Sequence, residues 1–123
     1  MGRREIIGKI GEDKACDYLE NNGYVILERN YRIRSGEIDI IAEKDSVLHF
    51  IEVKTRKGLG FGLPSESVTA KKRRHILKVA GYYLLCNREY AKMQCRMDVI
   101  ELLISDENYY IRLIENAFGE GEV

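Results

Sequence analysis

The chain has little of what marks a secreted, disulfide-rich or low-complexity protein. Its 123 residues include one proline, three cysteines and no tryptophan. An odd number of cysteines does not suggest a disulfide framework, and Cys16, Cys86 and Cys95 lack the paired spacing of a zinc site. We expect all three to be buried, as free cysteines usually are. With no repeat and one proline, the chain is predicted to form a single globular domain over residues 1–118, followed by a flexible tail at 119–123.

Long apolar runs are also missing. No uncharged apolar stretch approaches the ~20 residues that a membrane-spanning helix needs. Residues 1–4 lead into Ile6-Ile7-Gly8-Lys9 and not into the apolar core of a signal peptide. These absences predict a cytoplasmic protein without a membrane partner.

Charge is balanced over the whole chain but unevenly distributed. There are 20 Lys and Arg residues against 20 Asp and Glu residues, so the formal net charge is zero. Residues 54–78 nevertheless hold eight basic residues and one acid, a local net charge of +7. Residues 98–123 hold seven acids and one base, a local net charge of −6. A polyanion is therefore expected to bind near residues 54–78 and not near the C-terminus.

Hydrophobic periodicity predicts an α/β chain with the order α-β-β-β-α-β-β. Apolar residues recur at helical spacing in two segments and run through five strand-like segments. Gly8 and Gly11 inside the first helix predict close backbone packing on a sheet, because glycine otherwise weakens a helix. Short turns predict that the first three strands form an antiparallel meander. The expected elements are a helix at 5–22, strands at 24–33, 37–43 and 47–55, a helix at 69–88, and strands at 95–104 and 109–114.

Two short motifs carry the chemistry. One is Gly-Glu-Ile-Asp-Ile-Ile at 36–41, and the other is Glu52-Val53-Lys54 in the next strand. Alternation along a strand places Glu52 and Lys54 on one face, next to the carboxylate of Asp39. Two carboxylates suit Mg²⁺, which needs few protein ligands, and the lysine would add positive charge beside a phosphate. The structural alternative is an ordinary cross-strand pair between Asp39 and Lys54.

Four other polar residues are assigned from their positions. Glu12 borders the apolar stripe of the first helix and fits either a site acid or a surface salt bridge. Glu37, two positions before the motif aspartate, fits a second acid or a solvated residue beside a turn. Lys72 lies one turn before Ile76, so it borders the core-facing stripe and is expected to point toward the site. Asp98 is expected to have a structural role or to support the site residues, and not to bind a metal.

These motifs resemble those of a nuclease superfamily. Gly11-Glu12 in a helix, the motif at 36–41, Glu52-Val53-Lys54 and a following helix are similar to the restriction-endonuclease-like PD-(D/E)xK superfamily. More narrowly, the chain resembles the YraN-type uncharacterised family, which is related to archaeal Holliday junction resolvases. The likeness extends from about residue 5 to residue 118 and includes Glu-Val-Lys-Thr-Arg at 52–56 and Arg-Met-Asp-Val at 96–99. Ile38 stands where the superfamily motif has proline.

The resemblance implies a restriction-endonuclease-like core, with a mixed central sheet flanked by helices. It implies that Asp39 and Glu52 bind Mg²⁺ or Mn²⁺. Lys54 would serve the attacking water or the transition state, and Glu12 would be an additional catalytic acid. The implied function is hydrolysis of phosphodiester bonds in DNA. Branched or junction DNA is among the candidate substrates. A homodimer is a reasonable assembly. The basic stretch predicts nucleic-acid contacts from Arg56, Lys57, Lys72 and Arg73.

Two other functions stay open. One is a nucleic-acid-binding module that keeps the nuclease-like fold without turnover. The other is a protein-interaction domain whose acidic C-terminal region is the working surface. The intact set of Asp39, Glu52 and Lys54 favours catalysis, because a degenerate site would be expected to lose one of them.

Overall fold

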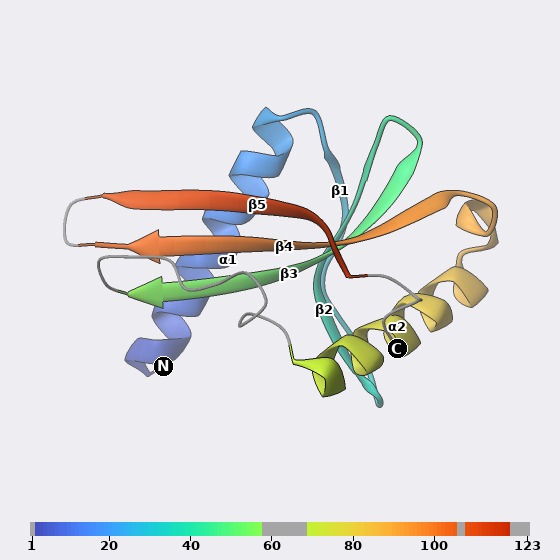
Figure 1. Ribbon diagram of the computed structural model, residues 1–123, viewed down its shortest axis with the longest axis horizontal. Helices are drawn as coiled ribbons and strands as arrows, with labels where there is room; N and C mark the ends of the chain where they lie inside the picture. The colour runs from blue at the N-terminus through green and yellow to red at the C-terminus, as the bar shows by residue number, and fades with distance from the viewer. Residues whose placement is uncertain (1, 58–68, 106–107, 119–123) are drawn as a thin grey trace.

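The computed structural model describes residues 2–57, 69–105 and 108–118. A five-stranded sheet lies between two α-helices, one on each face (Figure 1). The order of helices and strands agrees with the sequence prediction, to which the structure adds one short 3₁₀ helix. The elements are α1 (Arg3–Asn21), β1 (Val25–Ile33), β2 (Gly36–Lys44), β3 (Val47–Lys57), α2 (Ala70–Cys86), η2 (Arg88–Tyr90), β4 (Gln94–Ile104) and β5 (Tyr109–Phe118).

The sheet is mixed, with the spatial order β1-β2-β3-β4-β5. Neighbouring strands are antiparallel except β3 and β4, which are parallel. The first three strands form the predicted meander. A parallel pair needs a crossover connection, and α2 lies in the segment that joins β3 to β4. The crossover brings α2 to the face opposite α1 and puts β3 in the middle of the sheet.

Each face of the sheet has its own apolar core. On one face α1 buries Ala15, Cys16 and Leu19. On the other face α2 buries Ile76, Val79, Ala80 and Tyr83 of the core-facing stripe, whereas Leu84, which was expected to extend the stripe, is half-buried. The strand residues that complete these cores are Ile40, Ala42, Ile51, Ile100 and Leu102 under α1, and Ile38, Ile41, Leu48, Phe50, Met97 and Val99 under α2.

The ends and contacts of α1 follow from its sequence. Gly23 adopts φ of +89°, and the N–H of Tyr24 returns to the carbonyl of Leu19 at 2.9 Å, which closes the helix after Asn22. A Cβ on Gly11 would lie 1.9 Å from Oγ1 of Thr55, so α1 packs tightly on β3 there. The same expectation is wrong for Gly8, where a Cβ would meet nothing within 4 Å.

The cysteine prediction holds for one residue and fails for another. Cys16 is buried and Cys95 is half-buried, but Cys86 is exposed. Cys86 is the last residue of α2 and lies beyond Tyr83, the last buried residue of the helix. The tail predicted at 119–123 is outside the described residues. Within the described ranges, no helix combines the length and apolarity needed to cross a membrane.

Candidate functional site

The two sequence motifs meet where β2 and β3 separate. Residue pairing between these strands ends with Ile40 opposite Ile51. The next residues are Asp39 on β2 and Glu52 on β3, so the strand separation brings both carboxylates to one place. At this point the N–H of Val53 donates to Oδ2 of Asp39 at 2.8 Å. Asp39 and Glu52 are called the acidic pair below.

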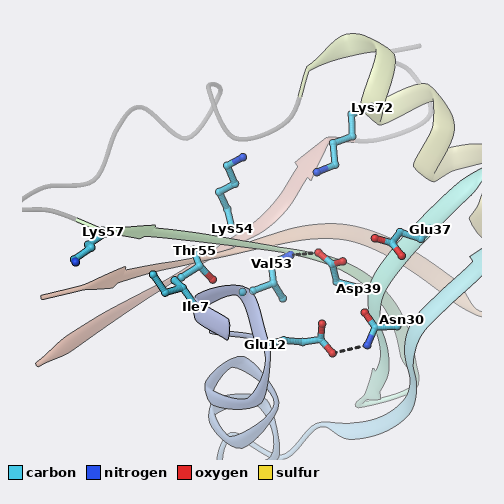
Figure 2. A pocket seen from close by; sticks show the side chains of 11 residues that line it. Ile7, Glu12, Asn30, Glu37, Asp39, Val53, Lys54, Thr55, Lys57 and Lys72 are labelled. Carbon is cyan, nitrogen blue, oxygen red and sulfur yellow. Dashed lines mark hydrogen bonds between the residues drawn. The ribbon is translucent and has the colours of Figure 1, made fainter. Parts of the chain in front are cut away.

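An open cleft of about 890 Å³ adjoins this separation (Figure 2). Its walls come from α1, all of the first three strands and the first turn of α2. Glu52 is the one predicted catalytic residue that does not line the cleft, because it lies deeper in the protein, with 5% of its surface exposed. The charged and amide side chains that line the cleft are Glu12, Asn30, Glu37, Asp39, Lys54, Lys57 and Lys72.

The surroundings of the acidic pair disfavour the charged form of Asp39. Burial, and secondly the nearby charge of Glu52, raise the pKa of Asp39 from its ordinary value of 3.8 to about 7. The N–H of Val53 and the ammonium of Lys72 act in the opposite direction but do not cancel the effect. Oε2 of Glu52 is buried without a hydrogen-bond partner among the described residues. Two close carboxylates with an unsatisfied oxygen are a site that a further cation would stabilise.

Lys72 already brings one positive charge to the acidic pair. Its ammonium forms an ion pair with Oε1 of Glu52. Thr69 fixes the first turn of α2 by accepting a hydrogen bond from the N–H of Lys72 at 3.2 Å. The helix start therefore directs the side chain of Lys72 toward β3, as its place beside the apolar stripe predicted.

Lys54 lies on the same side of β3 as Lys72 (Figure 2). The alternative of a cross-strand pair between Asp39 and Lys54 is not what the structure contains. Asp39 accepts its hydrogen bond from the Val53 main chain, and no ion pair of Lys54 is found in the described part of the chain. Lys54 is thus a half-buried residue whose side chain projects from a central strand into the cleft (Figure 2).

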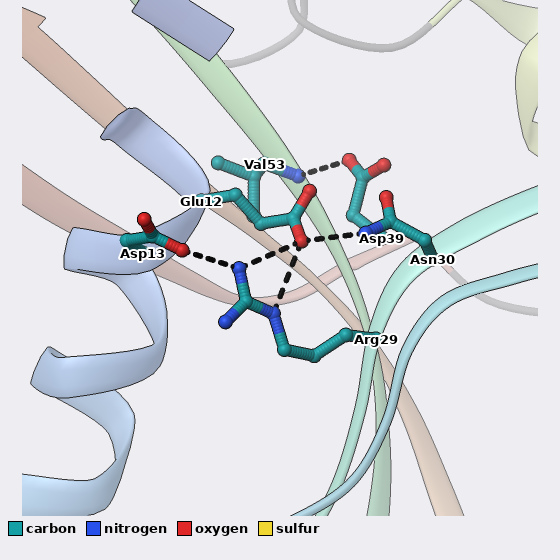
Figure 3. A network of polar contacts seen from close by, with 6 residues as sticks. All are labelled: Glu12, Asp13, Arg29, Asn30, Asp39 and Val53. Carbon is teal, nitrogen blue, oxygen red and sulfur yellow. Dashed lines mark hydrogen bonds and ion pairs between the residues drawn. The ribbon is translucent and has the colours of Figure 1, made fainter. Parts of the chain in front are cut away.

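Glu12 lies on the opposite side of β3, at the other wall of the cleft (Figure 2). Its Oε1 accepts hydrogen bonds from Nε and Nη2 of Arg29 at 3.1 and 3.0 Å and from Nδ2 of Asn30 at 2.8 Å (Figure 3). Arg29 also pairs with Asp13 at 2.6 Å. Both interpretations of Glu12 therefore apply, since it lines the cleft and forms a salt bridge. Glu12, Asp13, Arg29 and Asn30 are called the α1 network below.

Asn30 is a polar cleft residue that the sequence analysis missed. It has a φ of +52°, in the left-handed region that asparagine tolerates better than most residues. It interrupts the pairing of β1 with β2 beside Asp39, since Arg29 and Tyr31 have partners and Asn30 has none. Asparagine is uncommon inside strands, and this was the only signal that could have drawn attention to it.

The other predicted residues are spread over the surroundings of the site. Lys57 is exposed and lines the cleft. Arg56 is directed toward the buried Glu101, with Nε 3.9 Å from Oε2, and Arg73 is half-buried on α2. Glu37 lines the cleft, but it accepts two hydrogen bonds from Arg32 across the β1–β2 turn.

Asp98 lies outside the site, on the α1 face of the sheet. Its Oδ2 is 2.6 Å from Nδ1 of His49, and both side chains are buried. The ring of Tyr24 packs edge-on against His49, with centroids 5.1 Å apart. This enclosed pair fits the structural role that was expected of Asp98.

The stretch of the chain that resembles known proteins includes all of the site residues. The model of the uncharacterised protein family UPF0102 matches residues 11–102. The chain belongs to this family. It is the YraN-type family that the sequence motifs predicted. UPF0102 proteins from Clostridium botulinum (strain Loch Maree / Type A3) and Caldicellulosiruptor bescii are 47% and 50% identical to the chain over 114 residues. These alignments cover 91% of this chain and 93% and 96% of the two relatives.

A metal ion would need suitable donor atoms from this UPF0102 protein. In the described ranges, no group of three or more His, Cys, Asp or Glu side chains is arranged to hold one ion. The acidic pair offers two hard oxygen ligands, and the unsatisfied Oε2 of Glu52 is one of them. Mg²⁺ and similar ions keep several water ligands and bind through one or two carboxylates. The residues present therefore fit a hydrated Mg²⁺ or Mn²⁺ ion and not a closed metal centre.

Proposed function

We propose that this UPF0102 protein is a metal-dependent nuclease of the PD-(D/E)xK superfamily that hydrolyses phosphodiester bonds in DNA. The observation that carries the proposal is the meeting of Asp39 and Glu52 at the β2–β3 separation, with Lys54 of the same strand as Glu52 lining the adjoining cleft. Two carboxylates and a lysine on adjacent central strands match the motif order of the superfamily. The strands are held by the sheet, so the three side chains are positioned by rigid elements.

The acidic pair would hold Mg²⁺ or Mn²⁺. When bound, such an ion polarises a phosphoryl oxygen and lowers the pKa of bound water, so that hydroxide is available near neutral pH. Asp39 would be held in place by its hydrogen bond from the N–H of Val53. Glu52 would present its unsatisfied Oε2. The burial that raises the pKa of Asp39 would be offset by the positive charge of the ion.

Lys54 would act on the phosphate. Its ammonium enters the cleft from β3, the strand that carries Glu52, so it would lie close to a phosphate at the acidic pair. Negative charge grows on the phosphate oxygens in the transition state, and a fixed positive charge stabilises that state more than the ground state. Lys57 and Lys72 line the same cleft and would contact the nucleic-acid backbone.

A nucleic-acid-binding module without turnover is the second candidate. The observation that favours it is the ion pair of Lys72 with Glu52. With this pair formed, one carboxylate of the acidic pair is neutralised by the protein itself, and the cleft needs no metal to be stable.

A cleavage panel with a lysine variant separates the two candidates. Linear, single-stranded, flapped and four-way DNA would be incubated with the protein and Mg²⁺ or Mn²⁺. Lys54→Ala is expected to lower the cleavage rate by ~10²-fold or more while DNA affinity changes little. The matched control is Lys92→Ala, which removes an exposed lysine outside the cleft lining and should leave the rate unchanged.

The variants would be purified in parallel, because contaminating nucleases are the main hazard of this assay. If no substrate is cleaved in a way that Lys54→Ala reduces, and DNA still binds with salt-sensitive affinity, the binding module replaces the nuclease. If the protein neither cleaves nor binds DNA or RNA, both candidates are wrong and the protein-interaction function is left.

A further inference from the structure

Lys72 pairs with one oxygen of a carboxylate that the proposed function assigns to a metal. We propose that the ammonium of Lys72, which pairs with Oε1, is the built-in counter-cation of Glu52 in the metal-free protein. A divalent metal that binds the unpaired Oε2 must displace this ammonium, because the two positive charges on one buried carboxylate repel each other. This inference rests on the proposed function for the existence of the metal site. Its tests measure metal affinity and stability instead of cleavage, so the two can fail separately.

The two partners of the ion pair differ in how easily they could leave it. The side chain of Glu52 is 6% exposed, whereas that of Lys72 is 44% exposed. A buried carboxylate without a partner is strongly unfavourable, but an ammonium group at the surface can return to water at little cost. The lysine is therefore the exchangeable partner, and Glu52 is the fixed one.

The attachment of Lys72 supports this exchange. Its main chain is fixed in the capped first turn of α2, while its side chain is a flexible four-carbon stem. Its charge also acts on Asp39, so the ammonium serves both members of the acidic pair. Because Lys72 lines the cleft, the displaced ammonium would still be close to a phosphate that enters it.

Arg29 in the α1 network is an example of a counter-cation that is held by several hydrogen bonds. Its guanidinium donates two hydrogen bonds to Oε1 of Glu12 and one to Asp13. A planar guanidinium with several donors is held more rigidly than a single ammonium group. A lysine, and not an arginine, is therefore the residue expected at position 72 if the counter-cation has to be displaced.

The test is a titration of the protein with Mn²⁺ alone, followed by calorimetry or by the electron paramagnetic resonance of free Mn²⁺. Wild type, Lys72→Met and Lys71→Met would be compared at one pH and one salt concentration. Displacing a charged hydrogen bond lowers an equilibrium constant by about 10- to 100-fold, so Lys72→Met should bind Mn²⁺ more tightly by about that factor. Lys71→Met removes the same charge from the exposed neighbour on α2 and should change the affinity little.

Thermal unfolding gives a second readout of the same competition. In EDTA, Lys72→Met should unfold at a lower temperature than wild type, because Glu52 has lost its counter-charge. Excess Mn²⁺ should then raise the unfolding temperature more in Lys72→Met than in wild type. Lys72→Arg, which keeps the charge and should fold even if Lys72→Met does not, should bind Mn²⁺ no more tightly than wild type.

Each outcome decides between the two proposals. If wild type binds Mn²⁺ and Lys72→Met binds it equally or more weakly, the displacement inference is wrong while the metal site stands. If tighter binding by Lys72→Met is matched by Lys71→Met, the effect is general electrostatics, and the inference is also wrong. If wild type and all variants, including Glu52→Gln, fail to bind Mn²⁺, both the inference and the proposed metal dependence are overturned.

Discussion

In the α1 network, Glu12 is surrounded by donors from Arg29 and Asn30, whereas across the cleft the buried Glu52 has one oxygen paired and one unsatisfied. Both are glutamates with a basic partner, and both are predicted site acids. The difference lies in the number of donors and in the burial of the second oxygen. Oε1 of Glu12 accepts three hydrogen bonds and its side chain is 15% exposed, whereas Oε2 of Glu52 is buried without a partner, so Glu52 has more to gain from a further cation.

The aspartates of the two regions differ in the same way. Arg29, chiefly through a hydrogen bond, lowers the pKa of Asp13 in the α1 network. Burial and the charge of Glu52 raise the pKa of Asp39. One carboxyl is thus stabilised in its charged form and the other in its neutral form. Groups shifted against their charged form by burial and a like charge are typical of functional sites.

The largest expected effect is on catalysis. Asp39→Asn and Glu52→Gln should each weaken Mn²⁺ binding and lower the cleavage rate by about 10³-fold, because each removes a proposed metal ligand. Glu12→Gln should cost less than about tenfold, since Arg29 already balances the charge of Glu12. Calorimetry and single-turnover cleavage measure the two effects. Equal losses in all three variants would abolish the distinction between the acidic pair and the α1 network.

The next effect is on stability, and its sign follows from the raised pKa. Folded Asp39 keeps its proton up to a pKa of about 7, whereas the unfolded chain releases it near 3.8. Between these values the folded state binds more protons, so this group's contribution to the free energy of unfolding falls as pH rises from about 4 to 7. In EDTA at pH 8, Asp39→Asn should therefore stabilise the protein by up to ~4 kcal/mol, and at pH 4 by little.

Asp13 provides the opposite pH dependence as a control for that measurement. Its lowered pKa means that the stability it contributes is present above its unfolded pKa and is lost as pH falls through the folded one. Asp13→Asn should thus destabilise the protein at pH 8 and have less effect at low pH. Urea unfolding of both variants at pH 4 and pH 8 measures the contrast. A destabilised Asp39→Asn at pH 8 would mean that the acidic pair is not under electrostatic strain.

The sequence predicted the element order because the apolar patterns of Ile76 to Tyr83 and of the strands are strong local signals. It also predicted that Asp39 and Glu52 would be neighbours, since a short turn fixes the register of β2 with β3. It could not predict the ion pair of Lys72 with Glu52 or the contacts of Glu12 with β1. These join segments distant in the chain, and their geometry depends on how each helix packs on the sheet.

The smallest expected effect is on the salt dependence of DNA binding. Each phosphate contact contributes about 0.9 to the slope of log K against log salt concentration for duplex DNA. Lys57 is exposed in the cleft and is not part of the α1 network, so Lys57→Ala should flatten the slope by about that amount. Arg29→Gln removes the same charge. Because the guanidinium of Arg29 is already paired with Glu12 and Asp13, this substitution should leave the slope unchanged. Fluorescence anisotropy in EDTA measures binding without cleavage, and Glu115→Gln on β5 serves as the control at the acidic end. A slope that depends on Arg29 and not on Lys57 would place the DNA along the α1 network, and the proposed polarity of the cleft would be reversed.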